Sequence, residues 1–210
     1  MGRRAMAPHA SMGEMSAAIA DQEAAFIERC QRGDVGAFDA LVARYSSWVY
    51  HLAYRMTGDP DDAEDVAQEA FVRVFKAIRR YRRGAAFSTW LYRVVMNACL
   101  DELKRRQRRP VPLSAVVEPD AHPPEQADPS ADPLAIAQQR ERQAAIRRAI
   151  ASLPAHHRAV LVLCDLQGMS YEEAAQVIGA RVGTVKSRLN RARLALKDRL
   201  EPVMELVRSG

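Results

Sequence analysis

The sequence predicts an all-α protein with two small helical domains joined by a flexible, Pro/Asp-rich linker. Apolar residues make up 48% of its 210 residues, which is enough to build a core. They recur at helical spacing in both halves, whereas glycine is rare and alternating β-branched runs are scarce, which disfavours an all-β fold. Seven of the eleven prolines fall between residues 110 and 133, where they disfavour both a helix and a central strand.

The distribution of charge divides the chain at the same place. Residues 110–133 contain five acidic side chains and no Lys or Arg, while both flanking segments are net basic. We therefore expect a disordered tail over residues 1–20, one domain over 21–109, a linker over 110–133 and a second domain over 134–210. Basic segments favour a polyanionic partner, although two solvated helical surfaces would have the same composition.

Composition also excludes several classes of protein. No run of 18 apolar residues is present, so no direct membrane insertion is expected, and no apolar stretch follows Arg3 and Arg4 as a secretory signal requires. Cys30, Cys99 and Cys164 lie far apart, which argues against a disulfide framework and a zinc site. These features predict a protein of the reducing cytoplasm.

In the first domain we expect four helices, over residues 21–31, 35–55, 61–78 and 88–109. Asp34 is a suitable N-cap for the second helix, and Gly58-Asp59-Pro60 forms a turn before the third. Asp61 or a neighbour caps the third helix, and Ser88 caps the fourth. The basic, aromatic and glycine-terminated segment 79–84 is expected to be a loop.

The third helix presents two different faces. Its apolar residues form one broad stripe at helical period: Val66, Ala67, Ala70, Phe71, Val74, Phe75 and Ile78. The opposite face is polar except for Val72, which lies among Asp65, Gln68, Glu69 and Arg73. That valine hints at a docking surface, while an isolated exposed valine is the simpler interpretation.

The fourth helix has the composition of a nucleic-acid reader. Leu91, Val95, Ala98, Cys99 and Leu103 gather on one side. Another side carries Trp90 with a basic stripe that contains one asparagine: Arg93, Asn97, Lys104 and Arg108. Cations neutralise phosphates, asparagine can bond a base edge, and an aromatic ring offers a stacking face. A packed tryptophan and a solvated, cation-rich helix end are the simpler alternatives.

The second domain is expected to contain a helix-turn-helix. Helices are predicted over residues 135–152, 154–166, 171–178 and 182–200. Ser170 and Glu173 form a capping box, and Ala175, Gly179 and Val185 have the spacing of two helices crossing at a tight turn. The predicted buried stripe of the last helix contains Val182, Val185, Leu189, Ala192, Leu196 and Leu200. The side chains opposite this stripe are basic or polar: Lys186, Ser187, Asn190 and Arg191. Such a face suits the major groove, and Arg188 and Arg193 at its side would suit phosphates.

Taken together, the chain resembles a bacterial RNA polymerase sigma factor of the extracytoplasmic function (ECF) group, in the sigma-70 family. Four stretches in their order and spacing carry the resemblance: DDAEDVAQEAFVRVFKAI (61–78), FSTWLYRVVMNACLDELKRR (87–106), LPAHHRAVLVLCDLQGMSYEEAAQVIG (153–179) and VGTVKSRLNRARLALKDRL (182–200). The resemblance implies a region 2 domain and a region 4 domain. It implies a transcription initiation factor that binds core RNA polymerase through the β′ clamp helices and the β flap and directs it to promoter DNA.

The resemblance also assigns roles to individual residues. Contacts to core polymerase are expected from Asp62, Asp65, Gln68, Glu69 and Val72. Contacts to the −10 element are expected from Tyr81, Arg82, Phe87, Trp90, Arg93, Asn97, Lys104, Arg105 and Arg108. Contacts to the −35 element are expected from Thr184, Lys186, Ser187, Arg188, Asn190, Arg191 and Arg193. An anti-sigma factor is implied as a further partner, which could hold the protein at the inner face of the membrane.

No catalytic residue, metal or cofactor is expected, and no small-molecule substrate. The sequence contains no G-x-x-x-x-G-K-[ST], H-E-x-x-H or G-x-S-x-G motif, and His156-His157 point in different directions on a helix. Three alternatives stay open: a stand-alone repressor or activator, an enzyme acting on nucleic acid, and an adaptor that binds polymerase without promoter preference. A repressor would need a dimer interface, for which no heptad is present.

Overall fold

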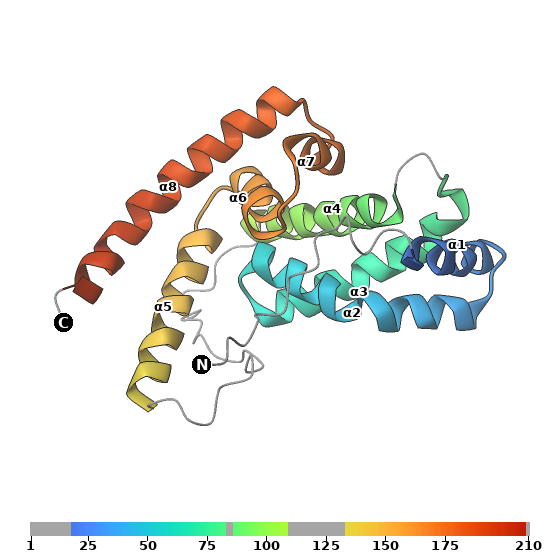
Figure 1. Cartoon of the computed structure of the whole chain (residues 1–210), viewed down its shortest axis with the longest axis horizontal. Coiled ribbons are helices and arrows are strands. Elements are labelled where there is room, and N and C mark those ends of the chain that lie inside the picture. Colours follow the sequence, from blue (N-terminus) through green and yellow to red (C-terminus); the bar gives the residue numbers. More distant parts are fainter. Residues whose placement is uncertain (1–17, 83–85, 109–132, 209–210) are drawn as a thin grey trace, which may run out of the picture.

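The computed structural model describes residues 18–82, 86–108 and 133–208, and within these ranges it contains helices and turns and no strand. The all-α prediction is therefore confirmed. In chain order the elements are α1 (Ala18–Gln31), α2 (Val35–Thr57), α3 (Pro60–Ala77), η1 (Ile78–Arg80), α4 (Phe87–Arg108), α5 (Pro133–Ala151), α6 (Ala155–Leu161), η2 (Val162–Leu166), α7 (Tyr171–Ile178) and α8 (Val182–Arg208). Figure 1 shows α1 to α4 gathered at one side of the molecule, with α5 to α8 arching over the other.

Local capping chemistry sets most of these boundaries. Asp34 accepts a hydrogen bond from the Ala37 amide at 3.0 Å and caps α2, as expected. Ser170 and Glu173 form the predicted capping box of α7. Gly179 ends α7 in the left-handed conformation with φ 65°, which only glycine adopts at little cost.

Several predicted boundaries were wrong by a few residues. Helix α1 begins at Ala18, inside the expected tail. The prediction of Asp61 or a neighbour as the cap of α3 is narrowed to Asp59, because Pro60 is well suited to the first helical position. Ser88 lies inside α4, and part of the expected loop forms the 3₁₀ turn η1. Helix α8 continues from the predicted end at Leu200 to Arg208.

Helices α2, α3 and α4 enclose one part of the hydrophobic core. Every member of the predicted apolar side of α4 is buried: Leu91, Val95, Ala98, Cys99 and Leu103. Phe75 departs from the predicted stripe of α3, because its side chain is 52% exposed. Its ring packs edge-on against Phe38 of α2, with centroids 5.0 Å apart, at the margin of the bundle.

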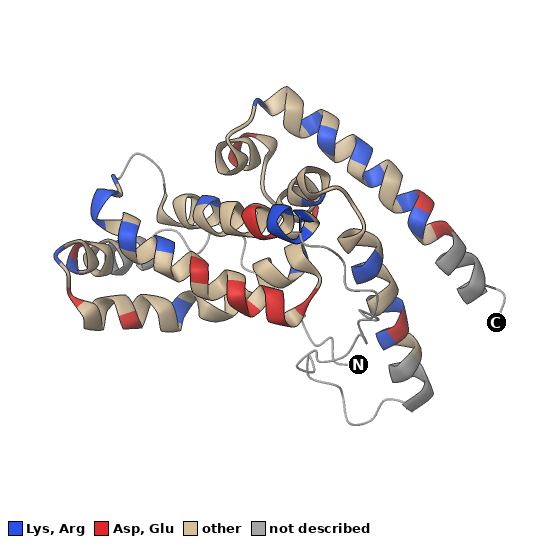
Figure 2. Ribbon diagram, turned by 180° about the vertical axis from the view of Figure 1, so that it is seen from behind, with Lys and Arg blue, Asp and Glu red and all other residues tan. Residues whose placement is uncertain are grey.

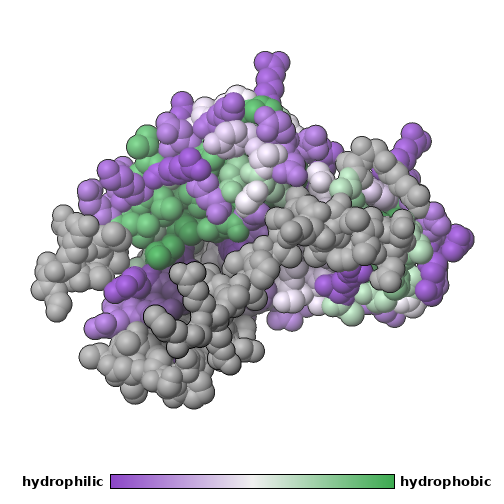
Figure 3. Space-filling model, in the orientation of Figure 1, coloured by the Kyte–Doolittle hydropathy of each residue, from purple (hydrophilic) through white to green (hydrophobic). Residues whose placement is uncertain are grey.

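Helices α6, α7 and α8 enclose a further part of the same hydrophobic core. Val185, Leu189 and Ala192 of α8 are fully buried against it, in agreement with the predicted stripe. The chain changes from α-helix to a π-helical turn at η2, where the Gln167 amide donates to the Val162 carbonyl. Figure 3 shows an apolar surface in the angle between α5 and α8. Ile146 of α5 is 41% exposed, and Leu196 of α8 is partly buried.

The two halves of the chain contact each other along α4. Helices α6 and α7 pack against α4, and α5 and α6 reach α2. Arg158 of α6 donates hydrogen bonds to the Met56 carbonyl of α2, to the carbonyl of Ala151 at the end of α5 and to the Leu153 carbonyl just after it. The Tyr92 hydroxyl of α4 donates to the Gln167 side chain at 2.9 Å. The described conformation is therefore closed, with the second half seated on the first.

Candidate nucleic-acid and protein interfaces

One face of α3 is exposed, acidic and apolar at its centre. Asp65, Gln68 and Glu69 are exposed there, and Val72 is 44% exposed. The face borders a cleft of about 520 Å³ between α3 and α4. Figure 2 shows acidic positions, in red, along α3 and basic positions, in blue, along α8. The structure thus brings four of the five sequence-predicted polymerase contacts together on one accessible surface.

Asp62, the fifth residue of that set, is half-buried and paired with α4. Its carboxylate pairs with Arg106 of α4 at 2.7 Å, and its side chain is only 19% exposed. Burial raises the pKa of the Asp62 carboxyl, while Arg106 opposes that shift. Asp62 is therefore positioned to fix α3 against α4 at the edge of the acidic face.

Arg73 stiffens the same face. Its guanidinium pairs with Glu69 one turn earlier and with Asp101 of α4, each at 2.8 Å. These two bonds raise the pKa of Arg73, with Glu69 making the larger contribution. The exposed patch around Val72 consequently rests on a fixed helix pair, and sequence periodicity could not reveal the bond between α3 and α4.

An aromatic cluster stands where η1 leads toward α4. The Tyr81 ring lies 5.2 Å from Trp90 and 5.6 Å from Phe87, between centroids. Tyr81, Trp90, Arg82 and Arg93 line one cleft, which has a volume of about 470 Å³. This arrangement combines aromatic stacking faces with cations, which are the two features of sites that bind single-stranded nucleic acid.

Phe87 differs from its predicted role. Its side chain is 3% exposed and packs against Tyr45, Tyr81 and Trp90, so it supports the cluster from beneath and cannot touch a ligand in this conformation. The other predicted residues farther along α4 are exposed: Asn97, Lys104, Arg105 and Arg108. Of these, Arg105 pairs with the buried Glu102 at 2.5 Å.

Arg93 is engaged by the second half of the chain. Its guanidinium donates to the Gln176 carbonyl of α7 at 3.1 Å from Nε and 2.5 Å from Nη2. Gln176 also forms part of the wall of the aromatic cleft. In the closed conformation, α7 therefore covers one side of the predicted −10 surface.

The outward face of α8 is basic and accessible. Lys186, Asn190 and Arg191 are exposed, and the Lys186 ammonium lies 5.5 Å from the centre of the Tyr171 ring of α7. The Ser187 hydroxyl donates to the Thr184 carbonyl one turn earlier. Because Val185 and Leu189 are buried on the opposite side, the polar side chains of this turn are held outward.

Arg193 and Arg188 are placed differently at the side of this face. Arg193 makes two hydrogen bonds to Asp165, at 2.9 and 2.6 Å, which raise its pKa. Arg188 is half-buried near His156 and His157 of α6. Burial, followed by the positive charges of α8, lowers the pKa of both histidines.

Within the described ranges, no group of three or more His, Cys, Asp or Glu side chains is placed to hold a metal ion. None of the described helices has both the length and the apolar character that a membrane span requires.

Comparisons with known proteins match both halves of the chain. The Sigma-70 region 2 family matches residues 41–109, and the Sigma-70, region 4 family matches residues 143–196. An RNA polymerase sigma-H factor of Pseudomonas aeruginosa is 39% identical over 187 residues, which cover 88% of this chain and 96% of the relative. An ECF RNA polymerase sigma-E factor of Escherichia coli is 37% identical over 193 residues, which cover 90% of this chain and 99% of the relative.

The fold is similar to that of a solved structure. CnrH in complex with the cytosolic domain of CnrY superposes with a TM-score of 0.58 at 26% identity, over 84% of this chain and 96% of the other.

Proposed function

This chain belongs to the extracytoplasmic function group of the sigma-70 family, and we propose that its described surfaces direct core RNA polymerase to promoters through three contacts. As a member of that family it is a transcription initiation factor. We assign region 2 to residues 21–109, the linker to 110–133 and region 4 to 134–210. The two family matches, over residues 41–109 and 143–196, support this division.

The exposed face of α3 is the proposed docking site for the β′ clamp helices. Val72 supplies an apolar centre, and Asp65, Gln68 and Glu69 supply a polar rim around it. This is the usual anatomy of a protein interface, in which a dry centre is surrounded by hydrogen-bonding groups. Asp62 acts indirectly, because its bond to Arg106 sets how α3 sits on α4.

The aromatic cleft is the proposed site for the melted −10 strand. Tyr81 and Trp90 offer faces for unstacked bases, and base–aromatic stacking contributes about 1–3 kcal/mol per base. Extruding a base from the duplex costs a few kcal/mol, which such stacking offsets. Arg82, Arg93 and Asn97 would contact the strand, with Phe87 supporting the cluster. The cations at the end of α4 would contact its backbone: Lys104, Arg105 and Arg108.

The outward face of α8 is the proposed reader of the −35 element. Lys186 and Arg191 can donate to guanine, and Asn190 can pair with adenine in the major groove. The remaining predicted residues flank these three and are suited to backbone contacts: Thr184, Ser187, Arg188 and Arg193. The region 4 match at residues 143–196 supports this assignment.

An anti-sigma factor is the proposed inhibitory partner. The related CnrH is bound by the cytosolic domain of CnrY. A partner of that kind would hold this protein in the cytoplasm at the inner face of the membrane. Its simplest mode of action would be to stabilise the closed conformation, in which Arg93 bonds to the Gln176 carbonyl. We assign no catalytic residue, cofactor or small-molecule substrate to this chain.

The single observation that carries the proposal is that the acidic α3 face, the aromatic cleft and the basic α8 face lie on one chain that matches both sigma regions. The test is transcription by purified core polymerase with this protein, on promoter fragments whose −35 and −10 blocks are randomised. We expect initiation from a subset of fragments enriched in two motifs, and none from core polymerase alone. Duplex binding without polymerase and without initiation would favour a repressor. Polymerase binding without promoter preference would favour an adaptor.

A further inference from the structure

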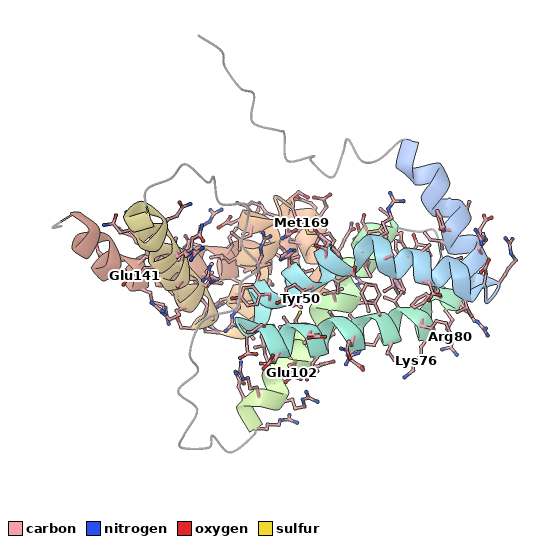
Figure 4. The ribbon with its side chains drawn as sticks, turned by 90° about the horizontal axis from the view of Figure 1, so that it is seen from below. Tyr50, Lys76, Arg80, Glu102, Glu141 and Met169 are labelled. Carbon is pink, nitrogen blue, oxygen red and sulfur yellow. The ribbon has the colours of Figure 1, made fainter. Side chains whose placement is uncertain are left out.

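Helix α1 lies before the matched region 2 segment, yet it contacts the element that leads into the aromatic cleft. The region 2 match begins at residue 41, whereas α1 ends at Gln31. Ile27 and Cys30 are each 5% exposed, and they anchor α1 in the core beside α2 and η1. Figure 4 shows Lys76 and Arg80, at the end of α3 and in η1, at the same end of the bundle as α1.

The last residue of α1 bonds directly to this segment. The Gln31 side-chain amide donates from Nε2 to the Ile78 carbonyl at 3.1 Å and to the Tyr81 carbonyl at 2.8 Å. A carboxamide nitrogen carries two hydrogens, so these bonds use its full donor capacity. The Ile78 carbonyl also accepts from the Tyr81 amide within η1, so Gln31 is its second donor. Gln31 lies 47 and 50 residues away from Ile78 and Tyr81 in the sequence.

The backbone of the turn after α1 also approaches η1 closely. Gly33 has φ 88°, and a Cβ placed there would lie 3.2 Å from Arg79 Nη2. Asp34 then pairs with Arg29 of α1 at 2.8 Å while it caps α2. The position of Gln31 is therefore fixed by the helices on both sides of it.

Tyr81 is the point through which this contact reaches the cleft. Its carbonyl is held by Gln31, and its ring forms one wall of the cleft, 5.2 Å from Trp90. A shift of the Tyr81 backbone would move that ring relative to Trp90 and Phe87. Gln31 itself does not line the cleft, so any effect on a bound strand must pass through Tyr81.

We propose that Gln31 is a positioning residue for recognition of the −10 strand, because its two hydrogen bonds set the distance between the Tyr81 and Trp90 rings. This inference rests on the proposed function of the aromatic cleft. It extends the promoter-reading machinery to α1, a helix outside the matched family segment. The proposed role also explains why α1 ends in Gln31, a half-buried polar side chain that faces η1.

The test uses two variants. Gln31→Met removes both hydrogen-bond donors while keeping a side chain of similar length. Gln31→Glu replaces the donor nitrogen by an oxygen, which cannot donate to the Ile78 and Tyr81 carbonyls. Gln107→Met is the matched control, because Gln107 is an exposed glutamine on α4 outside the cleft lining. Each full-length variant is assembled with core polymerase and tested on the randomised promoter pool. Core-polymerase affinity and the melting temperature of each variant are measured in parallel.

We expect Gln31→Met and Gln31→Glu to reduce the preference for the favoured bases in the −10 block about tenfold, from the loss of two hydrogen bonds. Core affinity and the −35 preference should stay within about twofold, because those surfaces share no contact with Gln31. Gln31→Lys keeps a donor and should retain most of the −10 preference. A residue with a purely structural role would not produce a selective loss of −10 preference that the donor in Gln31→Lys restores.

Two results would overturn the inference. One is an unchanged −10 preference in both donor-free variants. The other is a parallel loss of −10 preference, −35 preference and core affinity, with the same loss in Gln31→Lys, which would make Gln31 a general stability residue. If the wild-type protein itself showed no promoter preference, the proposed function would fail, and that outcome is separate because it does not depend on any Gln31 variant.

Discussion

Arg158 gives the sharpest test of how the closed conformation is stabilised. Its side chain is 6% exposed, burial lowers its pKa to about 10, and its hydrogen bonds reach the carbonyls of Met56, Ala151 and Leu153. Arg158→Met keeps the apolar stem and removes every donor. A bond from a charged donor contributes about 1.5–3 kcal/mol, whereas removing a buried cation relieves a desolvation penalty of several kcal/mol. We therefore expect a net loss of about 3 kcal/mol, since buried carbonyls are left without a partner.

The assay is urea and thermal unfolding of the full-length protein. A loss of about 3 kcal/mol lowers the melting temperature by about 6–12 °C in a chain of this size. Arg55→Met is the control, because Arg55 is an exposed arginine in the last turn of α2, near the Met56 carbonyl. Equal stability of the two variants would refute the reasoning, since the Arg158 bonds would then only compensate for burying its charge.

Three further predictions concern the surfaces. Asn190→Ala should weaken selection at one −35 position by about 1–3 kcal/mol in promoter-pool sequencing, and an equal loss on every sequence would mean that Asn190 touches only phosphate. Val72→Asp should lower core-polymerase affinity at least tenfold, because binding would then bury a charged side chain. The melting temperature should stay unchanged, and an unaltered affinity would show that α3 is not part of the interface. Because His156 and His157 have pKa values lowered below the ordinary 6.5, the unfolded chain binds more protons in this range. The free energy of unfolding should therefore fall as pH drops below 6.5, and a double His→Gln variant that keeps the same slope would contradict this.

Features encoded within one helix were predictable from the sequence. The Asp34 cap and the Ser170–Glu173 capping box depend on side chains three residues apart, and both formed as expected. The buried stripes of α4 and α8 also follow from helical period alone, and Val185 and Leu189 lie where that period places them.

Features that depend on contacts between helices were not predictable in the same way. Phe75 fits the apolar stripe of α3 by period, but the edge-on contact with Phe38 of α2 leaves its side chain 52% exposed. Phe87 looks like a candidate stacking residue beside Trp90, yet its ring is covered by Tyr45. Gln31 carries no local signal at all, because both of its partners are carbonyls about fifty residues away.

We infer that this chain opens promoters only when it is bound to core polymerase. A direct measurement of promoter opening is the most direct test of this inference. The measurement is permanganate reactivity of thymines in the −10 block of a selected promoter, with core polymerase alone, with the protein alone and with both. We predict reactive thymines only when both are present, and reduced reactivity when Trp90 is replaced by alanine. Opening by core polymerase alone, or full opening with the Trp90→Ala variant, would contradict the account.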